Sequence, residues 1–474
     1  MAANANTDRP EDPEEATIIN PDEAEEVVED ADSDVPMDSD SDGDEPMEVS
    51  LVNDAKAYFD KHGESIFSIA AHPTDKSIFL TGGGDDVAYV WTPDQVPTDP
   101  DEAKIIPREG KAIARLTGHK DSVSAAAFLG QTGQFAVTGG LDGKLQVYDA
   151  SQNWRVVDEA QEVQEVNWIS AHPSEVAFAL GANDGSVWVY SVDAGAGKLT
   201  FKQVFTSHTA SCTAGVWTSD GKLLVTVSED GSFYAWDVDA GRSVVALTAA
   251  DQRFAVEGGL YSAAVSPSGA AAVVGGATGE MRVVGMPTSQ AAAGARRTAG
   301  RPQAGGGGST GGGQAGQILA ALHTHTESVE SLSFHPTQPL LASGGVDGKI
   351  VIYDAGRGYP VRKTLGEEGG HHEAVVKVEF AKADGWILTS CGVDGTVRRW
   401  DVRAGTELSC WRGHLGGNAA EGEGGVLGFV QTPERIVTAG DEYVPLFECL
   451  IFLIVEVRAH ANDIYAVVSP WSLR

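Results

Sequence analysis

The sequence of 474 residues predicts an all-β fold made from one four-stranded unit that is repeated along the chain. The segment GGVDGKIVIYD, from Gly344 to Asp354, recurs several times. Its altered copies end at Trp91, Asp149, Tyr190, Asp237 and Asp401. Within most copies Asp-Gly is typical of a tight turn, and the alternating apolar residues after it are typical of a strand. Repetition at a nearly constant period favours one ring of repeats over several separate domains.

The spacing of the repeats predicts the number of units. Most copies place an anchor aspartate at the turn and an aromatic residue six positions later. These aspartates are Asp85, Asp142, Asp184, Asp230, Asp347 and Asp394. Most gaps between them are close to the ~40–45 residues of a four-stranded propeller blade. A worn copy has Thr278 at the anchor position, and a final copy follows His414. We therefore expect eight blades, with seven as the alternative if one degenerate copy does not form a blade.

The N-terminal segment differs from the rest in charge. The whole chain has a net charge of −35, and residues 1–50 hold 19 acidic side chains against the single base Arg9. Residues 1–54 are therefore predicted to be a disordered acidic tail, because such a composition cannot bury enough apolar surface. The tail has two interpretations, a solubilising segment or a device that captures a basic partner. Direct binding to nucleic acid is not expected, since that affinity depends mainly on Lys and Arg.

The cysteines and apolar segments indicate the compartment. Four scattered cysteines (Cys212, Cys391, Cys410 and Cys449) contain no Cys-x-x-Cys pair, which favours a reducing compartment and argues against a zinc site. The longest apolar run, residues 445–457, is shorter than the ~20 residues of a membrane-spanning helix. We therefore expect a monomer without metal, cofactor or membrane partner, located in the cytoplasm, with the nucleus as a further compartment.

The remaining elements are predicted in chain order. Residues 55–448 should form the propeller. Resemblance to WD-repeat propellers implies that Lys56–Phe59 is a leading strand that completes the last blade and closes the ring, which would also remove exposed sheet edges. Residues 92–111 and the Gly-rich residues 288–316 should be insertions between a third and a fourth strand, and the same resemblance places that connection on the face opposite the binding face. Residues 449–474 are predicted to be an atypical C-terminal extension. The repeat pattern is lost after Glu442, and a retained intron is one hypothesis for that loss, which sequencing of the transcript would test.

Several repeats combine residue types that also occur in hydrolases. One set is His208, Thr226, Asp230 and Trp236; another is His372, Ser390, Asp394 and Trp400; a third is His62, Thr81, Asp85 and Trp91. An active site occurs once, whereas this set recurs from repeat to repeat, and the chain has no Gly-x-Ser-x-Gly motif. We therefore expect these residues to form structural hydrogen bonds, and we expect no enzyme activity. The His-Pro pairs at His72, His172 and His335 are interpreted as turn residues.

Acidic residues recur where the chain approaches the first strand of each blade. They are Glu64, Asp121, Glu162, Glu165, Glu327, Glu330 and Glu373, with Phe67 among them. Asp441 and Glu442 stand at the turn of the final copy. Such segments of separate blades converge on one central opening, so we expect a ring of carboxylates that attracts a basic ligand. The alternative is an ordinary charged rim on an acidic protein.

The repeats resemble those of WD-repeat β-propellers, whose signature is Gly-His at one end and Trp-Asp at the other. The opening DAKAYFDKHGESIFSIAAHP, the motif AQEVQEVNWISAHP and the late RIVTAGDE further resemble the angio-associated migratory cell protein family, most closely its fungal branch. The resemblance implies an eight-bladed chaperone that captures the basic N-terminal segment of ribosomal protein L-ten (uL-sixteen) for assembly of the large ribosomal subunit, with pre-60S particles as a further partner. The alternative is a general interaction scaffold, such as a ubiquitin-ligase adaptor or a histone-binding propeller.

Overall fold

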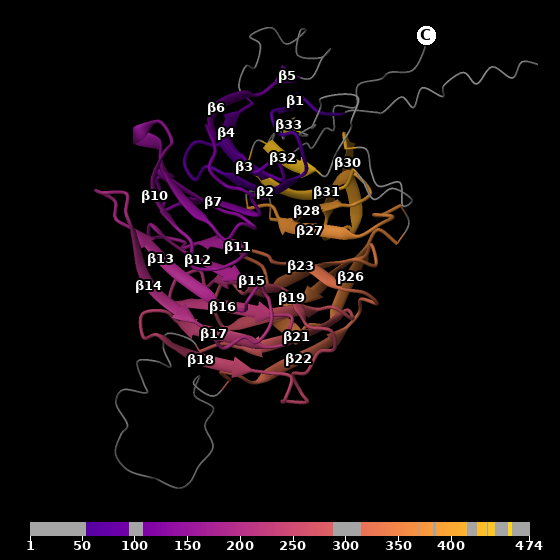
Figure 1. Ribbon diagram of the computed structural model, residues 1–474. Helices are drawn as coiled ribbons and strands as arrows, with labels where there is room; N and C mark the ends of the chain where they lie inside the picture. Colours follow the sequence, from indigo (N-terminus) through magenta and orange to yellow (C-terminus); the bar gives the residue numbers. More distant parts are fainter. Residues whose placement is uncertain are drawn as a thin grey trace, which may run out of the picture. The chain divides into compact units, whose positions relative to one another are not determined.

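The computed structural model describes residues 54–93, 108–287, 314–367, 369–382, 385–414, 424–433, 435–440 and 454–456. Over these residues the strands form eight antiparallel sheets arranged as a ring, which confirms the predicted eight-bladed all-β propeller (Figure 1). Two 3-10 helices, η2 (Ala150–Gln152) and η3 (Ala355–Arg357), each lie between the third and fourth strand of a blade.

The first four blades follow the chain from the N-terminal side. Blade 1 contains β2 (Ile66–Ala71), β3 (Phe79–Gly83), β4 (Ala88–Thr92) and β6 (Lys111–Leu116). Blade 2 contains β7 (Ala125–Leu129), β8 (Phe135–Gly139), β9 (Leu145–Asp149) and β10 (Arg155–Ala160). Blade 3 contains β11 (Val166–Ala171), β12 (Ala177–Ala182), β13 (Val187–Val192) and β14 (Leu199–Phe205). Blade 4 contains β15 (Cys212–Trp217), β16 (Leu223–Ser228), β17 (Phe233–Asp237) and β18 (Arg242–Leu247).

The other four blades complete the ring. Blade 5 contains β19 (Leu260–Val265), β20 (Ala271–Gly276), β21 (Glu280–Gly285) and β22 (Ile318–His323). Blade 6 contains β23 (Val329–Phe334), β24 (Leu340–Gly345), β25 (Ile350–Asp354) and β26 (Val361–Leu365). Blade 7 contains β27 (Val375–Phe380), β28 (Ile387–Gly392), β29 (Thr396–Asp401) and β30 (Thr406–Arg412). Blade 8 contains β31 (Val426–Gln431), β32 (Arg435–Gly440) and β33 (Ile454–Glu456).

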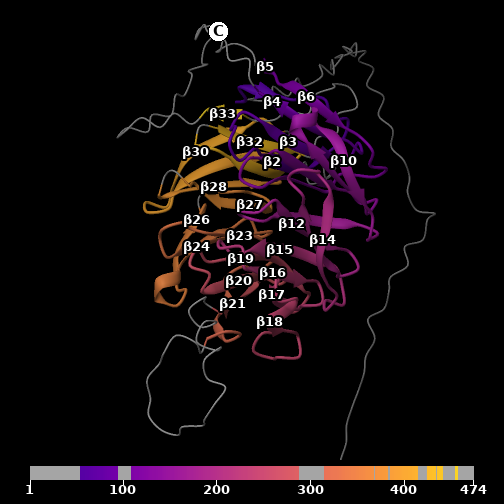
Figure 2. The same ribbon diagram turned by 90° about the vertical axis from the view of Figure 1, so that its left-hand side faces the viewer.

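The first strand of each blade lies nearest the centre of the ring. Figure 1 shows β2, β7, β11, β15, β19, β23, β27 and β31 around the middle, with the fourth strands at the periphery. Successive first strands contact one another, and β31 contacts β2, so the ring is closed. Blades 8 and 1 lie side by side in both views (Figures 1 and 2). Closure by itself protects the inner sheet edges from pairing with other chains.

Each blade folds as its sequence pattern predicts because the second and third strands are largely buried and pack against neighbouring blades. Between blades 4 and 5, for example, Phe233, Phe254, Leu260 and Val274 form one buried cluster. The residue after the anchor has a left-handed backbone in most blades, as at Gly231 with φ 72°. Glycine tolerates that conformation without strain, which explains the repeated Asp-Gly.

Polar side chains join neighbouring first strands near the centre. Ser124 Oγ donates to the carbonyl of Val166 in the next blade, and Thr213 Oγ1 donates to that of Leu260 at 2.6 Å. Ser262 Oγ bonds the carbonyl of Val329 at 2.6 Å. These bonds link each blade to the next through carbonyl groups at the starts of the first strands.

The His-Pro residues act as turn residues, as predicted, and they also join blades. His172 Nδ1 accepts from the amide of Glu175 at 2.9 Å, within its own turn. Its Nε2 lies 3.0 Å from the carbonyl of Gly221, in the corresponding turn of blade 4. His335 contacts the carbonyl of Gly385 in blade 7 in the same way. The sequence pattern indicated the turn but not the contact with the next blade.

The leading segment corrects one prediction. Among the described residues, strand β1 (Ala57–Tyr58) pairs in parallel with β5 (Arg108–Glu109), inside the insertion of residues 92–111, and not with the last blade. The third position of blade 8 is held instead by β33, which pairs with β32. The segment still bridges the two ends of the ring, because Phe59 packs against Trp91 of blade 1 and in the same cluster as Val437 of blade 8.

Strand β33 lies within residues 449–474, the segment predicted to be an atypical C-terminal extension. It continues the sheet of blade 8 in antiparallel register with Arg435–Val437. The insertions follow the third strands as predicted, between β4 and β6 and between β21 and β22. The acidic tail and most of the Gly-rich insertion lie outside the described residues. No helix in the described part of the chain is long and apolar enough to span a bilayer.

Candidate ligand-binding face

Topology defines two faces of the ring. We call top the face at which the first strands begin, and bottom the opposite face. Because the strands are antiparallel, the turns between second and third strands, with their anchor aspartates, also lie on top. The His-Pro turns and the connections from third to fourth strands lie at the bottom. The top face therefore gathers the segments that the sequence analysis singled out.

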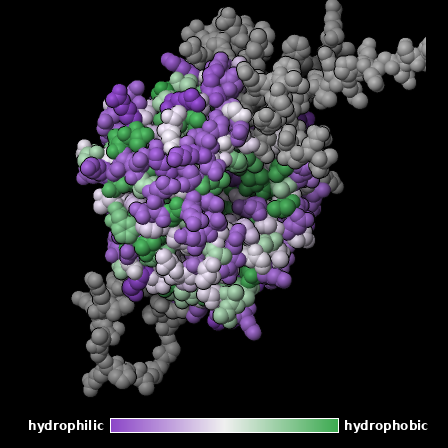
Figure 3. All heavy atoms as spheres, viewed as in Figure 1, coloured by the Kyte–Doolittle hydropathy of each residue, from purple (hydrophilic) through white to green (hydrophobic). Residues whose placement is uncertain are grey.

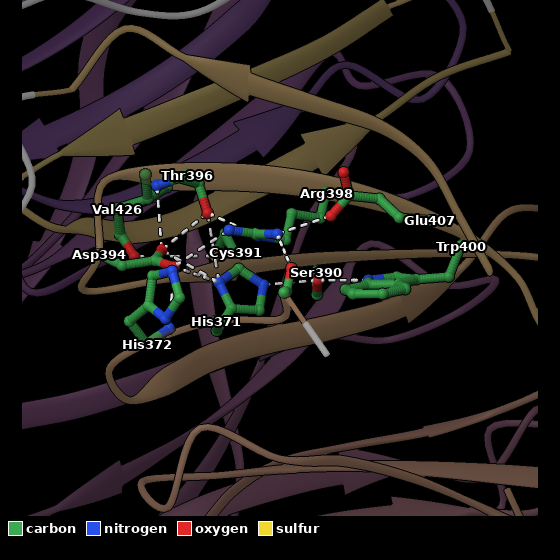
Figure 4. Close-up of polar contacts among 11 residues, drawn as sticks. His371, His372, Ser390, Cys391, Asp394, Thr396, Arg398, Trp400, Glu407 and Val426 are labelled. Atoms are coloured by element: carbon green, nitrogen blue, oxygen red, sulfur yellow. Dashed lines mark hydrogen bonds and ion pairs between the residues drawn. The ribbon is translucent and has the colours of Figure 1, made fainter. Parts of the chain in front are cut away.

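The anchor aspartates hold the top turns in place. In blade 7, His371 Nδ1 lies 3.0 Å from Asp394 Oδ1, and His371 Nε2 lies 2.7 Å from Ser390 Oγ (Figure 4). Trp400 Nε1 donates to the same Ser390 oxygen at 2.9 Å. The prediction that His372 belongs to this set is wrong, because His371 takes that place. His372 is exposed, and its backbone amide, not its ring, donates to Asp394 at 3.3 Å.

The same network recurs in other blades. His62 joins Asp85 and Thr81 at 2.9 and 3.0 Å, and His119 joins Asp142 and Thr138 at 3.1 and 2.8 Å. His325 lies 2.9 Å from Asp347 and 2.6 Å from Ser343. The histidine rings are buried, so these bonds offset the cost of removing polar groups from water. Recurrence in three blades besides blade 7 indicates a structural role.

Blade 4 carries a variant of the network. Here Ser232 lies between the histidine and the aspartate. The Ser232 hydroxyl donates to Asp230, and His208 Nδ1 lies 2.6 Å from Ser232 Oγ. His208 and Asp230 are consequently 3.9 Å apart. Burial lowers the pKa of His208 to about 4, and the more distant Asp230 offsets this only in part.

Two anchor positions lack a complete network. Asp184 is exposed and accepts bonds within its own turn, from the amide and hydroxyl of Ser186 at 2.9 and 2.6 Å. In the worn blade 5, where Thr278 replaces the aspartate, buried Arg282 donates to Glu280 at 3.0 Å and to the carbonyl of Ala255 at 2.9 Å. The blade therefore retains polar links between its top segments although it has lost the usual residues.

Four of the predicted acidic residues share one repeat position. Glu64, Asp121, Glu327 and Glu373 each stand two residues before a buried apolar residue, which begins the first strand in three blades and lies just before it at Val123. Three are exposed and Glu373 is half-buried. In blade 1, Glu64 and the ring of Phe67 both lie over Gly84, where an added Cβ would come within 2.9 Å of the Glu64 carboxylate and 3.3 Å of Phe67. Phe67 is 49% exposed, so this pair faces solvent.

Blade 3 places its two acids at other positions. Glu165 immediately precedes buried Val166 and is half-buried, and its carbonyl accepts from the amide of Asn183 at 3.3 Å. Glu162 stands four residues before Val166, where other blades have the network histidine, as His119 stands four residues before Val123. Glu162 is exposed, and its negative charge adds to burial in raising the pKa of Tyr190 in the same blade.

Glu330 takes part in a grouping across three blades. It follows buried Val329 on β23, and its charge acts on Tyr261 of blade 5. Burial raises the pKa of Tyr261, and the negative charges of Glu229 and Glu330 raise it further. Glu229 precedes the anchor Asp230 of blade 4 and is exposed. Blades 4, 5 and 6 thus contribute two carboxylates and a phenol to one part of the top face.

Tyr261 and Glu229 were not predicted, although their positions in the repeat indicate both of them. Phe67, Tyr261 and Glu330 occupy one position, immediately after the buried residue that begins the first strand. Glu229 occupies the position before the anchor. Aligning all eight copies on these two positions, rather than searching for acids, would have included both residues.

Two predicted binding residues, Asp441 and Glu442, lie outside the described residues. Spacing still indicates a role for one of them. His414 Nε2 lies 2.8 Å from Thr438 Oγ1, which is the usual link between the histidine and the hydroxyl residue. The anchor aspartate follows that hydroxyl residue by four positions in other blades, and Glu442 follows Thr438 by four. Glu442 is thus in register with the structural anchors, and Asp441 is in register with Glu229.

The top face can attract and hold cations. Acidic side chains stand on blades 1, 2, 3, 4, 6 and 7, and two aromatic side chains, Phe67 and Tyr261, lie among them. Hydrophilic residues cover much of the surface in view, with hydrophobic residues in small separate groups (Figure 3). Among the described residues no group of three or more His, Cys, Asp and Glu side chains is arranged to hold a metal ion. Guanidinium and ammonium groups are the natural ligands of such a surface.

Comparison with known proteins identifies related chains. The family description "WD domain, G-beta repeat" matches residues 110–149, 199–237, 316–354 and 362–401. The chain is 29% identical over 432 residues to ribosome assembly protein SQT1 of Saccharomyces cerevisiae, covering 85% of this chain and 88% of that protein. It is 26% identical over 400 residues to angio-associated migratory cell protein of Homo sapiens, covering 83% and 80%.

A solved structure is similar to most of the chain. It is the crystal structure of Chaetomium thermophilum Sqt1 bound to the N-terminus of ribosomal protein L10. The TM-score is 0.71 and the sequence identity 40%, and the match covers 86% of this chain and 100% of that one.

Proposed function

The chain belongs to the Sqt1 family of WD-repeat proteins, and we propose that it is a chaperone that binds the basic N-terminal segment of ribosomal protein L10 (L-ten) and supports assembly of the 60S subunit. The observation that carries this proposal is the Chaetomium relative in complex with that segment. The cytoplasm is the compartment in which a nascent ribosomal protein would first require such a partner.

The chemistry of the top face supports a basic peptide as the ligand. Arginine can form paired, charge-assisted hydrogen bonds with a carboxylate, and carboxylates stand on most blades around the opening. Phe67 is exposed beside Glu64 and can pack against the aliphatic part or the cationic head of such a side chain. A bound peptide would thereby be neutralised and kept from RNA until delivery.

A role in binding rather than catalysis is part of the proposal. The histidine, hydroxyl and aspartate sets that resemble hydrolase triads recur around the ring, and each hydroxyl is buried in a hydrogen bond to its histidine. A hydroxyl held there cannot reach a substrate on the surface.

Co-expression tests the proposal. The full chain should keep full-length L10 in the soluble fraction and copurify with it, whereas L10 without its N-terminal segment should be recovered at background level. A histone tail of equal positive charge serves as the control ligand. Copurification of both L10 forms, or equal recovery of the histone tail, would favour the general scaffold over a dedicated chaperone.

A further inference from the structure

A second charged site lies at the bottom edge where blade 6 meets blade 7. Two guanidinium groups approach the ring of Trp386, Arg362 at 5.6 Å and Arg403 at 5.4 Å from its centroid. Lys363 lies beside them and donates to the carbonyl of Arg403 at 3.2 Å and to that of Ala404. We name these four residues, Arg362, Lys363, Trp386 and Arg403, the basic rim.

Three separate elements position the basic rim. Arg362 is the second residue of β26, the outermost strand of blade 6. Trp386 ends the turn before β28, and Arg403 lies in the turn between β29 and β30. A backbone bond from the amide of Val402 to the carbonyl of Trp386, 2.9 Å long, joins the two turns of blade 7. The cluster is therefore fixed by rigid parts of the fold and not by a single loop.

The cations of the basic rim are weakly neutralised. Among the contacts of the described residues, Arg362 has its contact with Trp386 and no ion pair. Arg403 approaches Asp401 no closer than 4.0 Å, and its side chain is 62% exposed. Lys363 donates to carbonyls, which carry no formal charge. Arg357 and Lys382 add two exposed cations on adjacent turns, where the acids among the described residues are Asp401 and Asp354, the latter 3.8 Å from Arg357. In a chain of net charge −35, such a local excess of positive charge is unusual.

We propose that the basic rim is a docking site for an extended acidic segment of a partner protein, separate from the top face. Guanidinium groups bind carboxylates in paired hydrogen bonds, and Trp386 holds two of them in place before binding. Strand β26 is the last strand of its sheet in the described structure, so part of its backbone N–H and C=O groups can pair with an added strand. Aspartate or glutamate at alternate positions of that strand would face Arg362 and Arg403.

An acidic peptide fits better than RNA for three reasons. The net charge of the chain repels a long polyanion more strongly than a short acidic peptide. The guanidinium groups over Trp386 leave less of its ring for stacking on bases. A free strand edge offers hydrogen bonds to a peptide backbone, which a nucleic acid cannot use in this way.

Fluorescence anisotropy of the full chain at low ionic strength tests the site. The probe is a labelled peptide of about twelve residues in which Asp and Thr alternate. Arg362→Glu with Arg403→Glu should weaken its binding by about tenfold or more. The matched control is Arg155→Glu with Arg242→Glu, which reverses two exposed arginines that begin the outer strands β10 and β18. This control should bind the probe as the wild type does.

Further probes separate the parts of the proposal. A peptide of alternating Asp and Pro has the same charge but few backbone donors, and it should bind more weakly. If Arg362→Glu with Arg403→Glu lowers the melting temperature, Arg362→Gln alone takes its place and should still weaken binding. Unchanged affinity in these variants, equal affinity for the proline peptide, or tighter binding of an oligouridylate of similar length would overturn the proposal.

Discussion

A buried aspartate at the top of a blade is stable only with several donors around it. Asp394 accepts from His371 and from the amide and hydroxyl of Thr396 at 3.1 and 2.8 Å. Burial raises the pKa of Asp394, but these hydrogen bonds outweigh it and bring the pKa to about 2. The carboxylate is therefore the stable form in the fold, and removing it leaves buried donors without an acceptor.

Replacing this aspartate should destabilise the propeller. We expect Asp394→Ala to lower the free energy of unfolding by about 1–3 kcal/mol, the usual cost of buried groups left unsatisfied. The matched control is Asp184→Ala, at the same repeat position, where the carboxylate is exposed and caps its own turn. Denaturant titration should show a clearly smaller loss there. Equal losses in the two variants would mean that the histidine network adds no stability.

The pKa values also predict a dependence of stability on pH. His208 has a pKa of about 4 in the fold against 6.5 when unperturbed, so the unfolded chain binds the extra proton and stability falls as pH drops from 6.5 to about 4. Asp230 and Asp394, with pKa values of about 2 against 3.8, add a loss between pH 3.8 and about 2. Unfolding free energies across this range should decline in both windows. In His208→Gln the decline in the upper window should be smaller, and an unchanged slope would contradict the assignment.

Individual residues were predictable to the extent that the repeat determines them. The anchors and their hydroxyl partners follow from spacing, but two adjacent histidines, His371 and His372, satisfy the pattern equally, and burial decides between them. Tyr261 and Glu229 meet Glu330 because blades 4, 5 and 6 curve around one centre. Spacing along the chain does not predict that these three residues lie close together, since they belong to different repeats.

At the scale of elements, the leading segment shows how packing overrides a pairing rule. It was expected to add a strand to blade 8, but β33 occupies the free edge of β32. The segment instead contributes Phe59, which is fully buried and stacked on Trp91 with 4.7 Å between ring centroids. Asp54 joins it to blade 7, because its amide donates to the carbonyl of Arg412 at 2.8 Å. The leading segment therefore does connect the two ends of the ring, as expected, but β1 pairs with β5 and not with blade 8.

Phe59 should therefore be one of the more costly positions in the segment. We expect Phe59→Ala to reduce the free energy of unfolding by about 3–5 kcal/mol, because it leaves a cavity between the first and last blades. Phe67→Ala removes the same atoms from a side chain that is 49% exposed and should change stability little. Denaturant titration of both variants makes the comparison. A cost at Phe59 no greater than that at Phe67 would show that the segment does not join the ends of the ring.

At the scale of the whole molecule, eight similar blades form the ring, and the side chains that differ between blades determine what the top face binds. The fold was predictable because each repeat states its own strands and turns, and the ring follows from their number. The position of β33 could not be predicted, since its three residues lie outside the repeat pattern and have no turn or strand motif of the repeat. The binding face was predictable in sign but not in detail, because side chains from different blades meet only once the ring has closed.

The charges of the molecule are also arranged by face. Carboxylates stand on the top segments of most blades, whereas the exposed cations of the basic rim lie at the bottom of blades 6 and 7. A basic client and an acidic partner could thus bind at the same time without competing. Long-range attraction of the client should weaken with added salt, because charges further apart than about 8–10 Å are screened.

The central claim is that the top face binds the N-terminal segment of L10, and calorimetric titration of that peptide tests it most directly. We predict that Glu165→Lys with Glu330→Lys weakens binding by at least about tenfold, since each reversal replaces a carboxylate partner with a repelling charge. Glu109→Lys with Asp239→Lys reverses the same number of exposed charges at the bottom and should bind almost as the wild type does. Equal affinity of the top-face variant and the wild type would contradict the account.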